Sequence, residues 1–246
     1  MPDWKSRELF SSLVVPPDIP VIVRVDGWRF RRVADELGLS RPYDRRLMEA
    51  LVDAPKNLML TNFPLALAFV FSDEISFVVA PPLPWGGRVE KLITILASYT
   101  ASRITRSLNA PVGFDGRVVL VRGEGEIVDY LVWRQGEAWR NALNSYALKA
   151  LEDGGMDRKE AAEYLKGKKA EELHEIIFEK LGINLAKVPT WQRRGVVVRK
   201  VLRTKETKFG LVERRVVEAD WDPPLFSAPE GRSYLISSLR TGMSVF

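Results

Sequence analysis

The 246-residue chain contains no cysteine and only one histidine, His174. It can therefore form neither a disulfide nor a thiolate metal site, and a zinc centre would lack its usual ligands. A metal ion bound to this chain would be held by oxygen atoms, which suits magnesium or manganese. No apolar run approaches the roughly 20 residues that span a bilayer, and the first ten residues lack the apolar core of a signal peptide. We therefore expect a soluble, cytoplasmic protein with no membrane partner.

The residues that are present indicate a globular protein with an anionic partner. Hydrophobic residues make up 46% of the chain, which is enough for a large core. Lysine and arginine number 37 against 32 aspartate and glutamate residues, so the formal net charge is +5. This modest positive excess favours an anionic partner over a cationic one.

The order of apolar segments predicts an α+β fold with a ferredoxin-like core of the form βαββαβ. Short apolar runs rich in β-branched residues indicate strands, and apolar residues at about 3.6-residue spacing indicate helices. The predicted elements are strand 20–26, helix 44–52, strands 65–71 and 75–80, helix 89–108 and strand 118–121. We expect the Asp-Ala-Pro sequence at 53–55 to end the first of these helices.

The second half of the chain predicts helices followed by a basic hairpin. The helices are expected at 127–151, 158–165 and 170–181, and the hairpin strands at 196–202 and 211–217. Residues 187–215 contain ten lysines and arginines against two glutamates. This hairpin could bind a phosphate backbone or present an ordinary solvated face. We divide the chain into a palm-like catalytic core, 1–135, and a helical segment with the basic hairpin, 136–246, packed together as one unit.

Two acidic residues lie where predicted strands end. Asp26 closes the first strand and is followed by Gly27, and Asp73 lies in the tight turn between the second and third strands. In a ferredoxin-like sheet the first and third strands are neighbours, so these carboxylates should meet at one edge. Two carboxylates there could hold a pair of Mg²⁺ ions, as in palm-type polymerases. Acids are also common in turns, so the pattern alone leaves a purely structural role open for both.

A polar cluster lies within the helix predicted at 127–151. Arg134 follows Trp133, and Arg140 and Asn141 come about two turns later. Arginine and asparagine at this spacing could line a groove for phosphates or bases. The alternative is a solvated helix face with Trp133 packed inward.

The motifs around these positions resemble those of the tRNA-His guanylyltransferase family, including its archaeal and bacterial guanylyltransferase-like branch. The matching segments are VRVDGWRF at 23–30, RPYD at 41–44, FSDEISFV at 71–78, FDGRVV at 114–119, IVDYLVWRQGEAWRNALNSY at 127–146, GGM at 154–156, ELHEIIFEKLGIN at 172–184 and RRG at 193–195. The resemblance spans roughly residues 5–200, and the combination and order of these motifs are specific.

The resemblance implies a reverse polymerase that acts on the 5′ end of tRNA. In this family a nucleoside triphosphate activates the 5′-monophosphate of the tRNA. The 3′-hydroxyl of GTP then attacks the activated phosphate. The implied substrates are tRNA, ATP and GTP, with two Mg²⁺ ions per active site, and the implied assembly is a homotetramer. By this resemblance we expect helix 89–108 to contribute to the interface between subunits.

The resemblance also implies roles for individual residues. The metal ligands are Asp26, the carbonyl of Gly27, and Asp73, and the catalytic set is Asp26, Asp73 and Glu74. The implied nucleotide- or RNA-binding residues are Arg24, Gly27, Trp28, Arg29, Phe30, Arg41, Asp44, Ser72, Arg134, Asn141 and Asn184.

Three departures from the family pattern bear on the branch. Arg41 replaces a family lysine, Trp139 stands where the eukaryotic members have histidine, and Leu173 stands at a lysine position. These changes favour the branch that adds nucleotides by Watson–Crick pairing to a template, either to tRNA-His or to 5′-truncated tRNAs. The alternative functions on the same fold are a catalytically silent tRNA-binding protein and a nucleotide cyclase-like enzyme.

Overall fold

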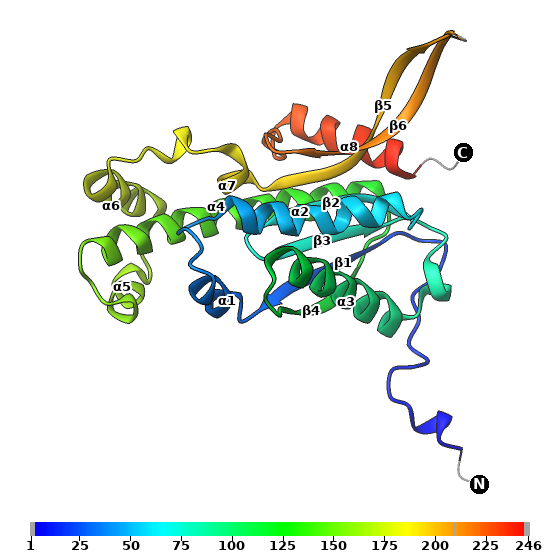
Figure 1. Ribbon diagram of the computed structural model, residues 1–246, viewed down its shortest axis with the longest axis horizontal. Coiled ribbons are helices and arrows are strands. Elements are labelled where there is room, and N and C mark those ends of the chain that lie inside the picture. The colour runs from blue at the N-terminus through cyan, green and yellow to red at the C-terminus, as the bar shows by residue number, and fades with distance from the viewer. Residues whose placement is uncertain (1–2, 209, 244–246) are drawn as a thin grey trace.

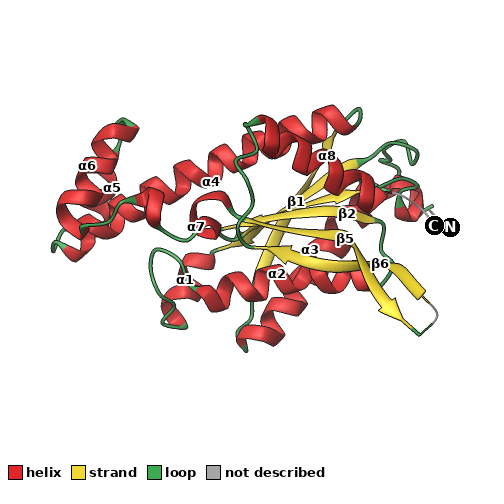
Figure 2. Cartoon of the chain, turned by 90° about the horizontal axis from the view of Figure 1, so that it is seen from above, coloured by secondary structure: helices red, strands yellow, loops and turns green. Residues whose placement is uncertain are grey.

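A six-stranded antiparallel sheet with helices on both faces forms the centre of the molecule (Figures 1 and 2). The computed structural model describes residues 3–208 and 210–243. The strands are β1 (Val21–Trp28), β2 (Leu65–Phe71), β3 (Glu74–Val79), β4 (Gly113–Leu120), β5 (Val196–Thr207) and β6 (Gly210–Asp220). The helices are α1 (Phe30–Glu36), α2 (Arg45–Leu60), α3 (Val89–Leu108), α4 (Glu124–Asp153), α5 (Arg158–Leu165), α6 (Ala170–Leu181), α7 (Thr190–Arg194) and α8 (Pro229–Met243), with short 3₁₀ turns at Lys5–Arg7, Pro84–Gly87 and Leu185–Lys187.

The strand order is β4-β1-β3-β2-β5-β6. The first four strands, with α2 and α3 between them, follow the predicted βαββαβ order, and the α+β class is confirmed. The C-terminal hairpin is also confirmed, but it does more than follow the core. β5 pairs with β2 from Val70 opposite Val196 to Leu67 opposite Arg199, so the hairpin extends the core sheet.

Apolar layers cover both faces of the sheet. α2 and α3 pack on one face around Leu51, Leu92 and Leu96, while α4 and α8 pack on the other around Leu131 and Leu235. This explains why β2 is an uninterrupted apolar run, since all seven of its residues are buried. A strand buried on both faces needs no polar alternation.

Helix α4 is 30 residues long and projects beyond the sheet, where α5 and α6 pack against it (Figure 2). The boundary expected between residues 135 and 136 falls inside this continuous helix. The division of the chain into two parts stays a prediction. No helix in the described part of the chain is long and apolar enough to cross a membrane.

Some predicted bounds were wrong. The helix expected at 44–52 continues through Pro55 to Leu60, because Leu58 and Met59 carry its buried face onward. Proline cannot donate the usual backbone hydrogen bond within a helix, and the burial of the surrounding residues compensates for that loss. The sequence did not predict α1, α7 or α8, and β4 begins at Gly113 rather than at residue 118.

Candidate active site

The ends of β1 and of the β2–β3 hairpin meet at one edge of the sheet. β1 and β3 are antiparallel neighbours, and Asp26 lies directly opposite Glu74. The backbone N–H of Gly27 donates to the carbonyl of Asp73 at 3.0 Å. The two acids predicted to meet are therefore held side by side by the backbone.

The hairpin turn fixes the Asp73 carboxylate. Ser72 adopts a left-handed backbone conformation with φ of 52°, which reverses the chain within two residues. Its hydroxyl donates to Oδ1 of Asp73 at 3.0 Å. Burial raises the pKa of Asp73, and the negative charge of Asp26 raises that pKa further. Holding the two negative charges together therefore costs the folded protein some of its free energy of unfolding.

No basic side chain of the described residues forms an ion pair with Asp26 or Asp73, so no salt bridge offsets the repulsion between these two carboxylates. Only glycine fits at position 27, because a Cβ atom there would lie 2.3 Å from the ring of Phe30 and 2.9 Å from Cβ of Asp73. The missing side chain allows the backbone of Gly27 to lie close to Asp73. Two carboxylates and a nearby backbone carbonyl suit a magnesium ion. The described residues contain no cluster of three or more acidic or histidine side chains arranged for a metal. Water or substrate oxygens would have to complete the coordination, as is usual for magnesium.

Glu74 has a different environment from the other two acids. Its carboxylate accepts hydrogen bonds from Nε and Nη2 of Arg134 at 2.9 and 2.6 Å, and Nε of Arg24 lies 3.7 Å away. Burial raises the pKa of Glu74, while the charges of Arg134 and Arg24 oppose this shift. This geometry fits a residue that positions two arginines beside the acids. The Nε atom of Arg24 is buried and has no hydrogen-bond partner in the described structure.

The alternative that packed Trp133 inward is wrong. The side chain of Trp133 is 50% exposed, and its neighbour Arg134 is the buried one, at 7%. The guanidinium of Arg134 lies 4.6 Å from the ring centre of Trp133. Helix α4 therefore turns its arginine, and not its tryptophan, toward the acids.

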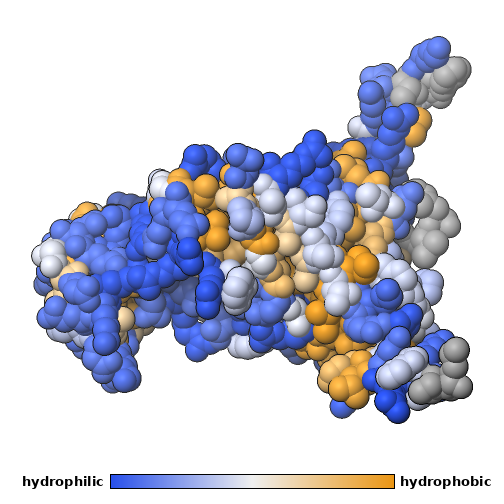
Figure 3. Space-filling view, turned by 60° about the horizontal axis from the view of Figure 1, so that its bottom comes forward, coloured by the Kyte–Doolittle hydropathy of each residue, from blue (hydrophilic) through white to orange (hydrophobic). Residues whose placement is uncertain are grey.

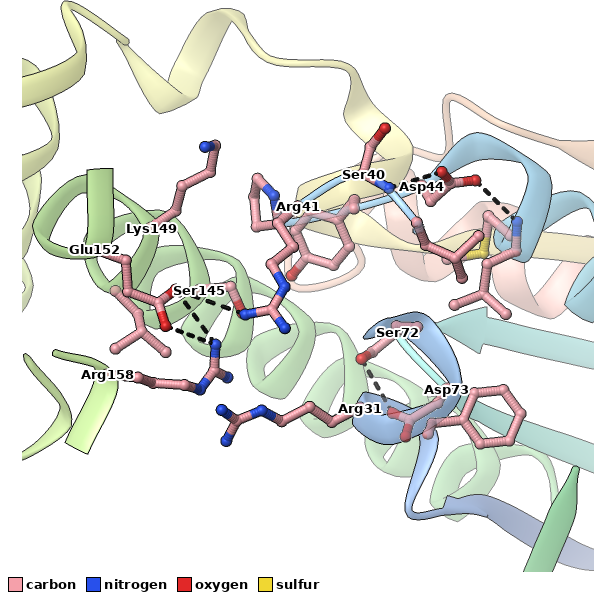
Figure 4. A pocket seen from close by; sticks show the side chains of 18 of the residues that line it. Arg31, Ser40, Arg41, Asp44, Ser72, Asp73, Ser145, Lys149, Glu152 and Arg158 are labelled. Carbon is pink, nitrogen blue, oxygen red and sulfur yellow. Dashed lines mark hydrogen bonds and ion pairs between the residues drawn. The ribbon is translucent and has the colours of Figure 1, made fainter. Parts of the chain in front are cut away.

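A basic pocket opens beside Asp73, between α1, the loop before α2, and α4 (Figure 4). Ser72 and Asp73 lie at one end, and the cationic side chains of Arg41, Lys149 and Arg158 lie toward the other. Its apolar lining comes from Phe30, Leu39, Pro42, Tyr43, Leu47, Met48 and Trp191. The pocket thus combines cations, carboxylates and an apolar wall.

Ion pairs organise the wall of this pocket. Glu152 bridges Arg158 at 3.1 Å and Arg41 at 3.7 Å, and Arg41 also pairs with Asp35. Asp44 lines the pocket but is occupied as the N-cap of α2, where it accepts from the N–H groups of Arg46 and Leu47. The same carboxylate accepts from the N–H of Ser40 and so fixes the loop.

Several predicted residues lie outside this pocket. Asn141 is exposed on α4, and Asn184 is an exposed cap whose Oδ1 accepts from the N–H of Ala186. Trp28 is 60% exposed at the end of β1, and the Arg29 guanidinium lies 4.7 Å from its ring centre. They border a separate hollow together with Pro111.

Four further residues that the motifs did not indicate also line the pocket, namely Arg31, Lys149, Glu152 and Arg158. A signal was present for part of this set. Ser145, Lys149 and Glu152 recur at spacings of four and three residues, which places them on one face of α4. Only the packing of α5 brings Arg158 to them.

The family of this chain follows from sequence comparison. Residues 3–122 match the family described as tRNAHis guanylyltransferase, and residues 125–222 match the family described as the Thg1 C terminal domain. A mouse protein named probable tRNA(His) guanylyltransferase is 33% identical over 208 residues, which cover 78% of this chain and 70% of the mouse protein. The chain belongs to the tRNA(His) guanylyltransferase family. The enzyme class expected from the motifs, nucleotidyltransferase, is thereby confirmed.

Other members and solved structures agree with this assignment. The Neurospora crassa tRNA(His) guanylyltransferase is 31% identical over 195 residues, covering 74% of this chain and 67% of that protein. A bacterial guanylyltransferase-like protein in complex with ATP superposes with a TM-score of 0.76 at 23% identity, covering 96% of both chains. The guanylyltransferase of Saccharomyces cerevisiae gives 0.69 at 23% identity, covering 86% of this chain and 95% of that one. At these identities the two structures show that the family fold is shared.

Proposed function

We propose that this family member is a template-dependent 3′–5′ nucleotidyltransferase of the archaeal and bacterial guanylyltransferase-like branch. It adds nucleotides to the 5′ end of tRNA and uses ATP and GTP as substrates. The observation that carries the proposal is the meeting of Asp26, Gly27 and Asp73 at one sheet edge. Among the described residues no basic side chain forms an ion pair with either carboxylate, and a basic pocket adjoins them. The β4-β1-β3-β2 order of the core strands supports a ferredoxin-like, palm-type catalytic core.

The acids are the proposed ligands of two Mg²⁺ ions. Asp26 and Asp73 would hold them with their carboxylates, and Gly27 with its backbone carbonyl. Bound there, divalent ions would compensate the charge that develops on the attacking and leaving oxygens in phosphoryl transfer. The protein contributes the fixed spacing of the ligands, which the Gly27–Asp73 backbone hydrogen bond maintains.

The pocket next to Asp73 is the proposed site of the nucleoside triphosphate. Arg31, Arg41 and Arg158 supply guanidinium groups suited to bidentate phosphate contacts. The apolar wall that includes Tyr43 and Trp191 suits a base. Arg24, with its unpartnered Nε, faces the acidic edge and would complete the phosphate environment.

The surroundings of Leu173 and Trp139, two positions where this chain differs from the eukaryotic members, support the templated branch. Leu173 is buried in the apolar cluster formed by α4, α5 and α6, and Trp139 packs beside His174 with ring centres 5.6 Å apart. Neither side chain can supply the cation or the titrating imidazole that the eukaryotic members have at these positions. Base pairing with the tRNA would therefore carry the selection of the incoming nucleotide.

An assay of nucleotide addition to the 5′ end of tRNA tests this function. The protein is incubated with 5′-labelled tRNA lacking its first nucleotide, ATP, all four nucleoside triphosphates and Mg²⁺, using substrates that differ only in the base opposite the gap. We expect the complementary nucleotide to be added in each case. Addition of G whatever the opposing base would place the chain in the non-templated branch. A silent tRNA-binding protein would give no addition, and a cyclase would give cyclic nucleotide in the absence of RNA.

A further inference from the structure

Two adjacent arginines at the end of α7, Arg193 and Arg194, line a second pocket and form no ion pair with an acidic residue of the described structure. Nε of Arg193 donates to the carbonyl of Val188 at 3.3 Å, its Nη2 to Thr190 at 3.4 Å, and Nη1 of Arg194 to the carbonyl of Pro223 at 3.3 Å. These bonds are long and go to neutral groups. No carboxylate of the described residues lies within ion-pairing distance of either guanidinium, whereas Arg41 and Arg158 of the first pocket and Arg134 beside Glu74 are paired.

The two positive charges also act on each other. Burial lowers the pKa of Arg193, and the charge of Arg194 lowers that pKa further, with only Asp222 opposing the shift. Gly195, which follows the arginine pair, has a φ of 75° and lies against Phe69, so this position has no room for a side chain. A Cβ atom there would lie 2.6 Å from the ring of Phe69. The chain thus fixes two like charges where an anion would relieve their repulsion.

The rest of this pocket is lined by uncharged residues. It lies between α4, α7 and the segment before α8, and its other lining residues are Val132, Gln135, Gly136, Trp139, Leu225 and Ser227. α7 lies beside α4 in both views of the chain (Figures 1 and 2). The cavity has a volume of about 430 Å³, within the usual range for small-molecule sites. It combines a cationic end with an indole ring.

Gln135 joins the three walls of the pocket. Its Nε2 donates to the carbonyl of Pro224 at 3.1 Å and that of Arg194 at 3.4 Å, and its Oε1 accepts from the N–H of Phe226 at 2.7 Å. Its neighbour on α4, Arg134, binds Glu74 in the candidate active site. Consecutive residues of one helix therefore support two different pockets.

We propose that this second pocket binds a nucleotide, with its phosphate on Arg193 and Arg194 and its base or ribose against Trp139. Paired guanidinium groups suit phosphate, and aromatic rings stack on bases. The choice of a nucleotide among phosphorylated aromatic ligands rests on the proposed function. The nucleotide can be free, as GTP or ATP, or part of the RNA chain, and the experiment separates these sources.

Equilibrium dialysis in EDTA tests the site, because chelation weakens the metal-dependent site without affecting the arginines. The probes are radiolabelled GTP, ATP, and a short single-stranded RNA with a 5′-hydroxyl. We expect Arg193→Ala/Arg194→Ala to weaken binding of at least one probe by about tenfold or more for each arginine lost. The matched control is Arg106→Ala/Arg122→Ala, which removes the same charge from exposed positions outside the pocket and should bind as the wild type does.

A second variant removes the pocket without touching its charge. A Cβ atom at Gly136 would meet nothing within 4 Å, so Gly136→Leu fits the helix, has a better helix propensity than glycine, and fills the cavity. We expect Gly136→Leu to lose affinity for the same probe as the arginine variant does. Gly136→Ala, which adds only a methyl group, should keep most of that affinity. Loss for GTP or ATP would assign the site to the free nucleotide, and loss for RNA alone would assign it to the RNA strand.

Unchanged affinity for every probe in the arginine variant, or wild-type binding by Gly136→Leu, would overturn the proposal. These outcomes are separate from a failure of the proposed function, because binding in EDTA requires no turnover. A chain that adds no nucleotide could still bind GTP here, and an active enzyme could still lack this site.

Discussion

At the residue scale, the three acids of the candidate active site have different environments. Glu74 is neutralised by Arg134 and approached by Arg24, whereas Asp26 and Asp73 have no cation in contact among the described residues. A buried charge without a partner is costly. Burial and the charge of Asp26 raise the pKa of Asp73 and so disfavour its carboxylate form, and a bound metal ion would offset this by stabilising the carboxylate.

We predict that Asp73→Asn abolishes nucleotide addition and stabilises the metal-free protein. Loss of a metal ligand removes several kcal/mol of transition-state stabilisation, so the rate should fall roughly a thousandfold or more. Removal of a buried charge next to Asp26 should raise the melting temperature in EDTA. Single-turnover kinetics and thermal unfolding measure the two effects.

The control for this prediction is Mg²⁺ itself. It should raise the melting temperature of the wild type and have little effect on Asp73→Asn, since ligand binding stabilises only the form that binds. Turnover close to that of the wild type in the variant would contradict the two-metal assignment.

At the scale of elements, the β5–β6 hairpin divides into an anchored base and an exposed arm that projects past the sheet (Figure 1). Arg199 belongs to the base. It pairs with Glu218 at 3.1 Å, donates to Ser238 at 3.1 Å and lies 4.3 Å from the ring centre of Tyr234. Arg203 also pairs with Glu218, at 2.8 Å. Because Arg199 and Arg203 already pair with groups of the protein, we do not expect them to contact RNA.

We predict that the exposed part of the arm positions the RNA backbone. Lys205 and Arg214 lie on opposite strands, are exposed, and form no ion pair within the described chain. Lys205→Ala/Arg214→Ala should weaken tRNA binding and reduce the log–log salt slope by about one unit for each lost phosphate contact. Filter binding at several salt concentrations measures both quantities.

Arg199→Ala is the informative comparison for this arm. It should lower the melting temperature, because it leaves Glu218 without one of its partners, and should change the salt slope less. If the Lys205/Arg214 variant binds tRNA with unchanged affinity and slope, the arm is an ordinary solvated surface.

At the scale of the whole molecule, the face turned forward in Figure 3 carries hydrophobic groups between charged margins. Ile95 on α3 is 39% exposed and Trp85, just before that helix, 40%. Leu13 lies nearby, because its carbonyl accepts from the N–H of Val89 at the start of α3. We propose that α3 contributes to a homo-oligomeric, and by family resemblance tetrameric, interface.

We predict that Ile95→Glu dissociates the assembly without unfolding the subunit. A partly exposed side chain contributes little to the core, but a charge buried in an interface is strongly disfavoured. Light scattering coupled to size-exclusion chromatography should show a smaller species with an unchanged circular dichroism spectrum. Leu120→Glu, a control at a 62% exposed position on β4, should assemble as the wild type does. A monomeric wild type would contradict the prediction.

Local sequence determined most of the element framework. The bounds of β2, α3, α5 and α6 were predicted to the residue, because in each case periodic burial stops at a turn, a glycine or a change of spacing. The meeting of Asp26 with the β2–β3 turn was also predictable, because strand order in a βαββαβ core makes β1 and β3 neighbours.

The tertiary structure decided what depends on contacts between distant residues. Sequence could not show that Arg134 would neutralise Glu74 from 60 positions away, or that Arg158 would join Glu152 and Arg41 at a pocket wall. It could not show that β5 would pair with β2, or that burial would carry α2 through Pro55. Propensity and periodicity are local, whereas ion pairing, pocket shape and the desolvation that shifts the pKa of Asp73 arise only when separate elements pack together.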